Sequence, residues 1–466
     1  MRKFLIVSFL ITIFSLPAFT QTKLLTINEQ LSDLQKLEKS LKQVHPALYR
    51  FTSPTKIDSA IYSIREQIVS PKSKEEFLSL INSLFLLIKD AHTWAKLPSD
   101  NLPPEKLIPF DFKILNDKLI VYNNCSKNKE LQPGTSITKI NERSTKNIID
   151  SLERLVITDG FIETTKERNV EEWFKYSYKV QSNNTMTYKR GHKEKTTTIE
   201  ALYEKEIDSI RLSRAENQLN LKPTPPLKPP FMEFYSRSNY GIIKLKWFDR
   251  MNFPKYKEYL DSCIHELNVK DVKNLIIDLR WNIGGPRDYS IYLLSKFFDQ
   301  PFYYCESLIT TKFTFDEKNP FDSSKVFVPI DNSLYKVTEN ARGLGLISPA
   351  DEVFKGNIFL LVNGQSNSSA AQVASLIYHY KRGIIIGEEP GGLYGGGTGE
   401  YHYYLTLTNS KIKVQIPRYR IVLKVDQSKF VGHGVQPNHT IKTDINKLLN
   451  GTDNIMDYTI NLIETK

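Results

Sequence analysis

Cysteine, long apolar segments and internal repeats are scarce in this 466-residue chain, and each scarcity excludes a class of protein. The three cysteines are too few and too far apart for a disulfide framework, and none has a spacing typical of a zinc site: Cys125, Cys263 and Cys305. We therefore expect no metal, no cofactor and at most one disulfide. The composition is that of a globular protein, and the length indicates two to four structural units.

Only one apolar run bears on targeting. Residues 4–16, FLIVSFLITIFSL, follow a positively charged start and precede small residues, which is typical of a secretory signal peptide over residues 1–20. The run is too short to span a bilayer, although a membrane anchor remains the alternative. We expect cleavage near Thr20–Gln21, a periplasmic or extracellular protein, and no stable membrane span afterwards.

The net charge of +11 comes from lysines that are spread along the chain, often beside glutamate or aspartate. This pattern indicates a solvated basic surface rather than a binding patch. No module that combines aromatic and basic residues is visible, so nucleic acid is not an expected partner.

The first half of the chain divides into two regions. Residues 21–105 have the apolar periodicity of helices, and Ser73–Glu76 form a capping-box pattern before a second strong helix. Residues 106–205 alternate as strands do, with a helical insertion at about 144–178. We expect a helical unit followed by a β-rich domain.

A proline-rich linker, residues 206–232, is expected to be extended and stiff, and it separates these regions from residues 233–466. In the last region apolar strands alternate with helices, around an apparently irregular stretch at 299–355. Such alternation predicts an α/β core with a mainly parallel sheet and helices on both faces. The segments 403–408 and 411–416 alternate more clearly and predict a hairpin.

Two strand ends of this core carry candidate site residues. Ser366, Ser368 and Ser369 lie between an apolar strand and a helix, where free N–H groups favour negative charge. A helix N-cap is the alternative role for any of them. Gly284 and Gly285 follow another strand and allow a ligand to approach the backbone.

Four segments in order resemble the motifs of the C-terminal processing peptidases and their tricorn relatives: DLRWNIGG (278–285), SNSSAAQVA (366–374), GEEPGG (387–392) and GHGVQPNHTI (432–441). LQPGTSITKIN (131–141) resembles a segment of the PDZ-like domain that these tail-specific proteases carry. The resemblance implies a peptidase S41-like chain with a ClpP/crotonase-like core.

The resemblance also implies residue roles. Ser369 corresponds to the nucleophile, and the backbone N–H groups of Ala370, Gly284 and Gly285 correspond to the oxyanion hole. Gln372 stands where the motif usually has glutamate.

The general base is where the chain departs from the lysine-dyad enzymes of this group. Tyr394 occupies the position expected for lysine, and no lysine occurs between Lys381 and Lys411. KDAHTWAK (89–96) resembles the histidine segment of the tricorn-like branch, so His92 is the expected base, with His402 and His433 as alternatives. For the acidic residue that orients it we favour Asp426 over Asp90, Glu388, Glu389 and Glu400.

These expectations describe a secreted serine-type endopeptidase that hydrolyses protein or peptide substrates through a Ser–His mechanism. A non-catalytic protein that binds a ligand or peptide on the same fold is the alternative, because a fold alone does not establish hydrolysis.

Overall fold

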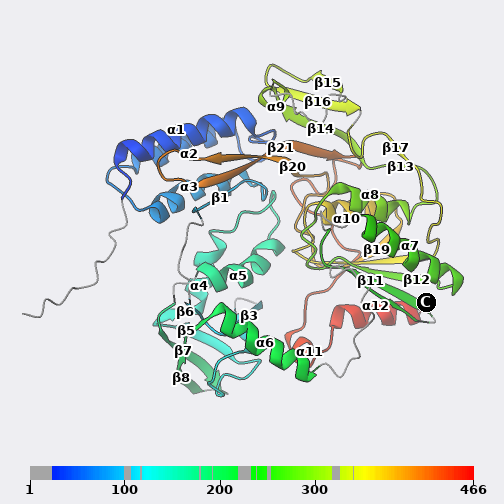
Figure 1. Cartoon of the computed structure of the whole chain (residues 1–466), viewed down its shortest axis with the longest axis horizontal. Helices are drawn as coiled ribbons and strands as arrows, with labels where there is room; N and C mark the ends of the chain where they lie inside the picture. The colour runs from blue at the N-terminus through cyan, green and yellow to red at the C-terminus, as the bar shows by residue number, and fades with distance from the viewer. Residues whose placement is uncertain are drawn as a thin grey trace, which may run out of the picture.

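The computed structural model describes residues 24–98, 106–115, 118–177, 180–190, 193–218, 232–237, 239–248, 253–316, 326–339 and 341–465 (Figure 1). The predicted signal peptide, residues 1–20, lies outside these ranges. Within them, no helix is both long enough and apolar enough to cross a membrane.

Three helices form the N-terminal unit: α1 (Ile27–Val44), α2 (Pro54–Glu66) and α3 (Lys74–Ile88). The predicted capping box is confirmed, since Ser73 accepts the N–H of Glu76 and Glu76 accepts the N–H of Ser73. Each such cap satisfies N–H groups that a helix start leaves unpaired.

The helical unit shares its hydrophobic core with a hairpin from the far end of the chain, β20 (Thr398–Thr406) and β21 (Lys413–Leu423). Leu34, Leu84, Leu405 and Val414 are among the buried members of this core. Figure 1 shows the blue helices beside the brown hairpin. Since each buried leucine contributes about 1.5–3 kcal/mol, this packing joins the two ends of the sequence firmly.

The region predicted as PDZ-like has a sheet of order β3-β4-β5-β7-β8, with β6 paired to β5. Its helices pack on the same core as the sheet. The bounds are β3 (Phe110–Leu115), β4 (Lys118–Asn124), β5 (Ser136–Ile140), β6 (Arg143–Ser144), α4 (Thr145–Glu153), α5 (Thr164–Ser177), β7 (Asn183–Arg190) and β8 (Lys193–Glu200), beside the small pair β2 (Lys106–Leu107) and β9 (Leu202–Tyr203).

The predicted linker is wrong in its first half. Helix α6 (Glu204–Gln218) occupies residues expected to be extended. The prolines begin only at Pro223, and the preceding segment contains neither proline nor glycine, so nothing opposes a helix there. Residues 219–231, which hold the prolines, lie outside the described ranges.

The core sheet has the order β10-β11-β12-β18-β19-β22, and only β10 runs antiparallel to its neighbour. Its strands are β10 (Met232–Ser236), β11 (Tyr240–Leu245), β12 (Asn274–Asp278), β18 (Asn357–Val362), β19 (Gly383–Gly387) and β22 (His439–Thr440). The predicted mainly parallel sheet is therefore confirmed.

Helices cover both faces of this sheet. One face packs against α7 (Phe253–Val269), α8 (Arg287–Ser295) and α10 (Ser369–His379), and the other against α12 (Asn454–Glu464), which follows the short α11 (Ile445–Leu449). Strands buried on both faces read as continuous apolar runs, which is why the sequence predicted them well.

A second sheet stands beside the core, in the order β1-β21-β14-β16-β15, with β20 paired to β21. Its other strands are β1 (Trp94–Lys96), β14 (Cys305–Thr311), β15 (Val326–Pro329) and β16 (Leu334–Glu339); α9 (Lys312–Asp316) and the pair β13 (Phe302–Tyr303) and β17 (Leu346–Ile347) lie near them in sequence. The stretch 299–355 is thus not irregular. The hairpin is confirmed, and it belongs to this second sheet.

Candidate active site

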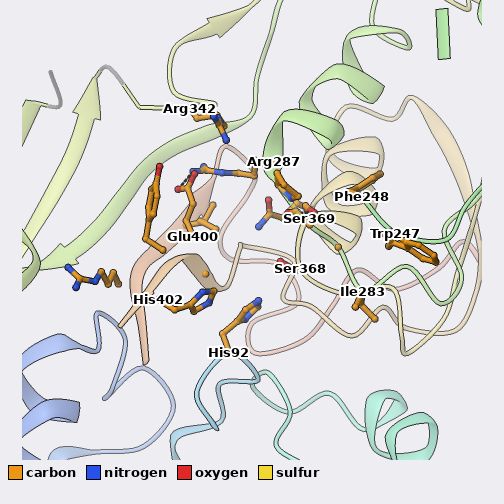
Figure 2. A pocket seen from close by; sticks show the side chains of 18 of the residues that line it. His92, Trp247, Phe248, Ile283, Arg287, Arg342, Ser368, Ser369, Glu400 and His402 are labelled. Atoms are coloured by element: carbon orange, nitrogen blue, oxygen red, sulfur yellow. Dashed lines mark hydrogen bonds and ion pairs between the residues drawn. The ribbon is translucent and has the colours of Figure 1, made fainter. Parts of the chain in front are cut away.

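A cavity of about 1010 Å³ lies where the serine turn, the glycine turn and the hairpin β20–β21 meet the segment after α3 (Figure 2). Ser369, Gly284, Gly285 and His92 all line it. The fold therefore brings together residues that are up to 277 positions apart.

Ser369 is the first residue of α10 and is almost fully buried. The preceding Ser368 has φ 49° and ψ −127°, a conformation that L-residues rarely adopt, so the chain turns sharply just before Ser369. The Ser369 hydroxyl donates a hydrogen bond to the Gly285 carbonyl at 2.9 Å. Ser366 has a different role, because its hydroxyl donates to Leu279 O and accepts the Asn363 N–H within the turn.

The two glycines are required by close contacts. A Cβ on Gly284 (φ 93°) would lie 2.6 Å from the Cβ of Ser368, and a Cβ on Gly285 (φ 150°) would lie 2.1 Å from the carbonyl oxygen of Phe248. The glycine turn thus packs directly against the serine turn, with no room for a side chain between them.

The predicted oxyanion donors differ in their hydrogen bonds. The Gly284 N–H donates to Asn282 Oδ1 at 2.9 Å, and the Ala370 N–H donates to Asn367 O at 3.0 Å. The Gly285 N–H donates to no residue within the described part of the chain. Two of the three predicted donors are therefore engaged inside their own turns in this conformation.

His92 lies in the turn between α3 and β1, and its side chain points into the cavity beside His402 (Figure 2). Its carbonyl oxygen accepts a hydrogen bond from Gln415 Nε2 at 3.0 Å, and its N–H donates to Asp90 Oδ1 at 2.8 Å. The rings of His92 and His402 are stacked, with centroids 6.2 Å apart. The second sheet thereby fixes the position of His92.

Two buried carboxylates, Asp90 and Asp159, lie behind the His92 ring. Nδ1 of His92 is 3.9 Å from Asp90 Oδ1 and has no hydrogen-bond partner among the described residues. Ligand atoms of His92, Asp90 and Asp159 all lie within 4.8 Å of one another. Asp159 was not predicted; the Asp159–Gly160 pair reads locally as an ordinary turn.

The two carboxylates differ in their electrostatic surroundings. Burial opposes ionisation of Asp90 and by itself would raise its pKa. The opposite effect comes from His45, through a hydrogen bond and its charge, and also from the charge of His92 and a hydrogen bond from Thr398. These interactions outweigh burial, so the pKa of Asp90 lies below its ordinary value. His45 Nδ1 accepts the Ala47 N–H, so its Nε2 carries the proton, 2.8 Å from Asp90 Oδ2. Burial raises the pKa of Asp159 to about 6, with a further contribution from the charge of Asp90.

The same three side chains are close enough to hold a metal ion. Their oxygens already have protein donors, however: Thr398 and the His92 N–H bind Asp90, and the Ala91 N–H binds Asp159 at 2.8 Å. These hydrogen bonds hold Asp90 and Asp159 next to His92, so the cluster is explained by its role in supporting the loop that carries His92.

The structure does not bring Asp426 to His92, which corrects the preference for Asp426 as the orienting acid. Asp426 is exposed, accepts hydrogen bonds from Ser428, and does not line the cavity. It belongs to a surface turn closed by the Lys429 N–H, so its nearness in sequence to a family motif was misleading.

The other candidates lie in different places. His402 and Glu400 line the cavity, whereas His433 is 3.1 Å from Glu389 outside it. Glu388 is buried and does not line the cavity. Tyr394 is buried against Tyr378 and Phe430, and burial raises its pKa to about 12.

Comparisons with known proteins bear on the family and the fold of the chain. Residues 239–441 match the family model described as peptidase family S41, a range that contains Ser369 and both glycines but not His92. No curated protein sequence matches the chain significantly.

Among solved structures, mature CPAF matches with a TM-score of 0.65 at 14% identity over 94% of this chain and 96% of that chain. Mature CPAF complexed with lactacystin matches with a TM-score of 0.68 at 14% identity over 94% and 98%. The tricorn protease matches with a TM-score of 0.44 at 16% identity, over 94% of this chain and 37% of its own. This score is too low to establish a shared fold. At these identities the likeness to CPAF shows the fold alone.

Proposed function

Because residues 239–441 match the model of peptidase family S41, we propose that this protein is a serine-type endopeptidase of that family, with Ser369 as nucleophile and His92 as general base. The observation that carries the proposal is the shared cavity: Ser369 at a helix start, His92 facing it and the glycine turn beside it. The substrate is a protein or peptide.

The first step requires the Ser369 hydroxyl to leave the Gly285 carbonyl. Rotation about χ1 gives the side chain two other staggered positions, and one directed at His92 lets imidazole accept the proton as Oγ attacks the peptide carbonyl carbon. Catalytic hydrogen bonds are often unformed before substrate binds, so the observed contact is compatible with this role.

The oxyanion that forms on the substrate then needs N–H donors. The Gly285 N–H supplies one, and the Ala370 N–H supplies a second once its bond to Asn367 opens. His92 afterwards returns the proton to the leaving amine. Water then attacks the acyl-enzyme carbonyl while His92 accepts its proton, and His92 gives that proton to Ser369 Oγ as the acid product leaves.

The buried carboxylates position the imidazole. Asp90 stays ionised beside Nδ1 and stabilises the imidazolium that forms during attack, while Asp159 holds the loop through the Ala91 N–H. Among the described residues that line the cavity there is no lysine, and Tyr394 lies elsewhere, which favours histidine over a lysine dyad.

A fluorophosphonate probe tests the proposal, because only an activated serine reacts with it. We expect one adduct, mapped by mass spectrometry to Ser369, and loss of casein hydrolysis in parallel. Ser369→Ala removes both, while the matched variant Ser368→Ala, at the neighbouring cavity serine, keeps labelling. A protein that binds ligands on this fold without catalysis would show no adduct and no hydrolysis.

Two finer assignments belong to the same proposal. The sheet of residues 110–200, with α4 and α5, is assigned as a PDZ-like domain on its resemblance in sequence. The protein is secreted after cleavage near Thr20–Gln21, which N-terminal sequencing of the mature form checks.

A further inference from the structure

A second cavity, of about 620 Å³, is separate from the one that contains Ser369, and the two share no lining residue. Its walls come from the segment that follows α1, the junction of β14 and α9, the turn that leads into β16, and Arg420 of β21. Figure 1 shows α1 beside α9 and β14. Neither the proposed nucleophile nor the proposed base lines this second cavity.

The charged side chains of this second cavity are basic. Four of them are lysine or arginine: Lys42, Arg50, Lys312 and Arg420. No aspartate or glutamate is among the described lining residues. Lys42 is neutralised by Glu38 and Asp58, each 2.8 Å away. The other three form no ion pair within the described part of the chain, so the cavity has more positive charge than the protein itself balances.

Arg420 is the least satisfied of these groups. The residue is half-buried, and its Nε is enclosed with no hydrogen-bond partner among the described residues. Burial lowers the pKa of Arg420, and no carboxylate counteracts this effect. Burying a guanidinium without an acceptor is costly, so an anion in the cavity would remove a cost that the unliganded protein bears.

Arg50 brings a second guanidinium to the same cavity. Its Nη1 donates to the Gly396 carbonyl oxygen at 2.8 Å, which uses one of its five N–H groups. Burial and the charge of Arg420 lower the pKa of Arg50 to about 10, although the charges of Asp159 and Asp90 act in the opposite direction. An anion bound by both guanidinium groups would replace their repulsion with attraction.

A phosphate group fits these cations better than a single carboxylate does. Arginine forks bind phosphate oxygens in pairs, and lysine adds a point charge. Arg50, Lys312 and Arg420 together carry three positive charges. A phosphate ester, at about −1.5 to −2 near pH 7, offsets more of that charge than a carboxylate, at −1, does.

The rest of the wall gives room for an organic group as well. Part of it is apolar: Pro46, Ala47, Leu48, Phe313 and Leu334. The volume of about 620 Å³ lies within the range of roughly 300–1,000 Å³ that is typical of small-molecule sites. A phosphate that carries a small apolar substituent can therefore use both parts of the cavity.

We propose that the second cavity binds a phosphate group through Arg50, Lys312 and Arg420, either as free phosphate or as the phosphate of a small organic molecule. The proposal does not depend on the peptidase function, because binding is measured without turnover. His45 also lines this cavity, and its Nε2 is 2.8 Å from Asp90 Oδ2. The phosphate site thus adjoins the residues that support His92 without being part of the catalytic cavity.

The test is isothermal titration calorimetry on the purified full-length protein at constant ionic strength, set with sodium chloride. Three ligands are titrated: inorganic phosphate, phenyl phosphate and benzoate. Arg420→Met keeps the apolar stem of the side chain and removes its charge. Lys312→Gln changes an exposed residue, which the fold tolerates. The matched control is Arg65→Met, at a half-exposed arginine paired with Glu38 on the N-terminal helices.

We expect one phosphate or phenyl phosphate to bind per chain, with benzoate at least about tenfold weaker than phenyl phosphate. Arg420→Met should weaken phosphate binding at least about tenfold, because it removes charge-assisted hydrogen bonds in an enclosed site. Lys312→Gln should weaken it about two- to fivefold, as for an exposed charge. Arg65→Met should leave the affinity unchanged.

Each outcome has one meaning. Equal affinities for phosphate and phenyl phosphate support the site and identify the free anion as its ligand, whereas tighter binding of phenyl phosphate supports the site and identifies an organic phosphate. Benzoate that binds as tightly as phenyl phosphate overturns the assignment to phosphate. Absence of saturable binding, or binding that neither cavity variant weakens, overturns the site. Should Arg420→Met not fold, Lys312→Gln decides alone, and an unchanged affinity in that variant overturns the site.

Discussion

The hydroxyl of Ser369 is held by the carbonyl oxygen of Gly285, 2.9 Å away, rather than by an imidazole. In the proposed mechanism the glycine turn therefore has two roles: it restrains the Ser369 hydroxyl, and it supplies the Gly285 N–H to the oxyanion. The proposed activation requires only a χ1 rotation of Ser369, while the two turns stay packed together. The close contact between Gly284 and Ser368 is therefore needed to keep Ser369 in place.

Gly284→Ala should reduce fluorophosphonate labelling of Ser369 by at least about tenfold, because its Cβ would lie 2.6 Å from Ser368 and displace the serine turn. Gly345→Ala is the matched control: Gly345 also has positive φ, 81°, but a Cβ there meets nothing within 4 Å. Labelling rates are compared at equal folded fractions. Equal rates for the two variants would show that the contact does not control the nucleophile.

His92→Ala should abolish peptide hydrolysis, with a loss of roughly 10⁶-fold as for the histidine of other serine triads. His402→Ala should cost less than about tenfold, since its ring packs on the rings of His92 and Tyr404 and has no role in the proposed proton transfer. Steady-state kinetics on a casein-derived peptide measure both. Retained activity in His92→Ala together with loss in His402→Ala would transfer the base to His402.

Asp159→Asn should change how stability depends on pH. The folded pKa of Asp159, about 6, lies above the ordinary 3.8, so the folded state binds this proton more tightly than the unfolded state. Its contribution to the free energy of unfolding therefore falls as pH rises from 3.8 to about 6. The amide keeps an acceptor for the Ala91 N–H and has no such dependence.

Urea unfolding at pH 4 and pH 7 measures this effect. Relative to the wild type, Asp159→Asn should gain stability between the two pH values, on the order of 1 kcal/mol or more. Asp150→Asn, at a surface ion pair on α4, is the control and should show little change. Parallel pH profiles for wild type and Asp159→Asn would contradict the assignment.

Asp90→Asn should lower kcat strongly, by up to about 10⁴-fold, because a neutral amide does not stabilise the imidazolium that forms at His92. Asp426→Asn should leave kcat unchanged, since that carboxylate does not line the cavity and accepts its hydrogen bonds from Ser428 in its own surface turn. The comparison is made at saturating peptide. A large loss in Asp426→Asn, with none in Asp90→Asn, would restore the sequence-based preference.

Sequence reasoning worked where local pattern and structure coincide. The core strands are buried on both faces and read as continuous apolar runs, as in the strand that precedes Ser369. The sharp turn at Ser368 follows from packing against Gly284, and both belong to motifs with a recognisable order of residues.

It failed where the decisive contact is distant in the chain. Asp159 reaches His92 only because the Ala91 N–H and the Lys89 carbonyl bind the Asp159–Gly160 turn, and no local pattern encodes that pairing. Asp426 illustrates the converse, since it is near a motif in sequence and on the surface in space. Helix α6 was not predicted, because the prolines from Pro223 onward led to the prediction of an extended linker for the whole segment.

The shared core of the N-terminal helices and the hairpin β20–β21 has a consequence for the timing of synthesis. His92 leaves the ribosome early, but the strand that anchors it, with Gln415, emerges only when most of the chain has been made. A nascent chain that ends before β21 contains the imidazole and even Ser369 without the wall that brings them together. The proposed active site is thus completed only late in synthesis, so ribosome-stalled chains ending at residue 410 should resist the fluorophosphonate that labels the full-length protein.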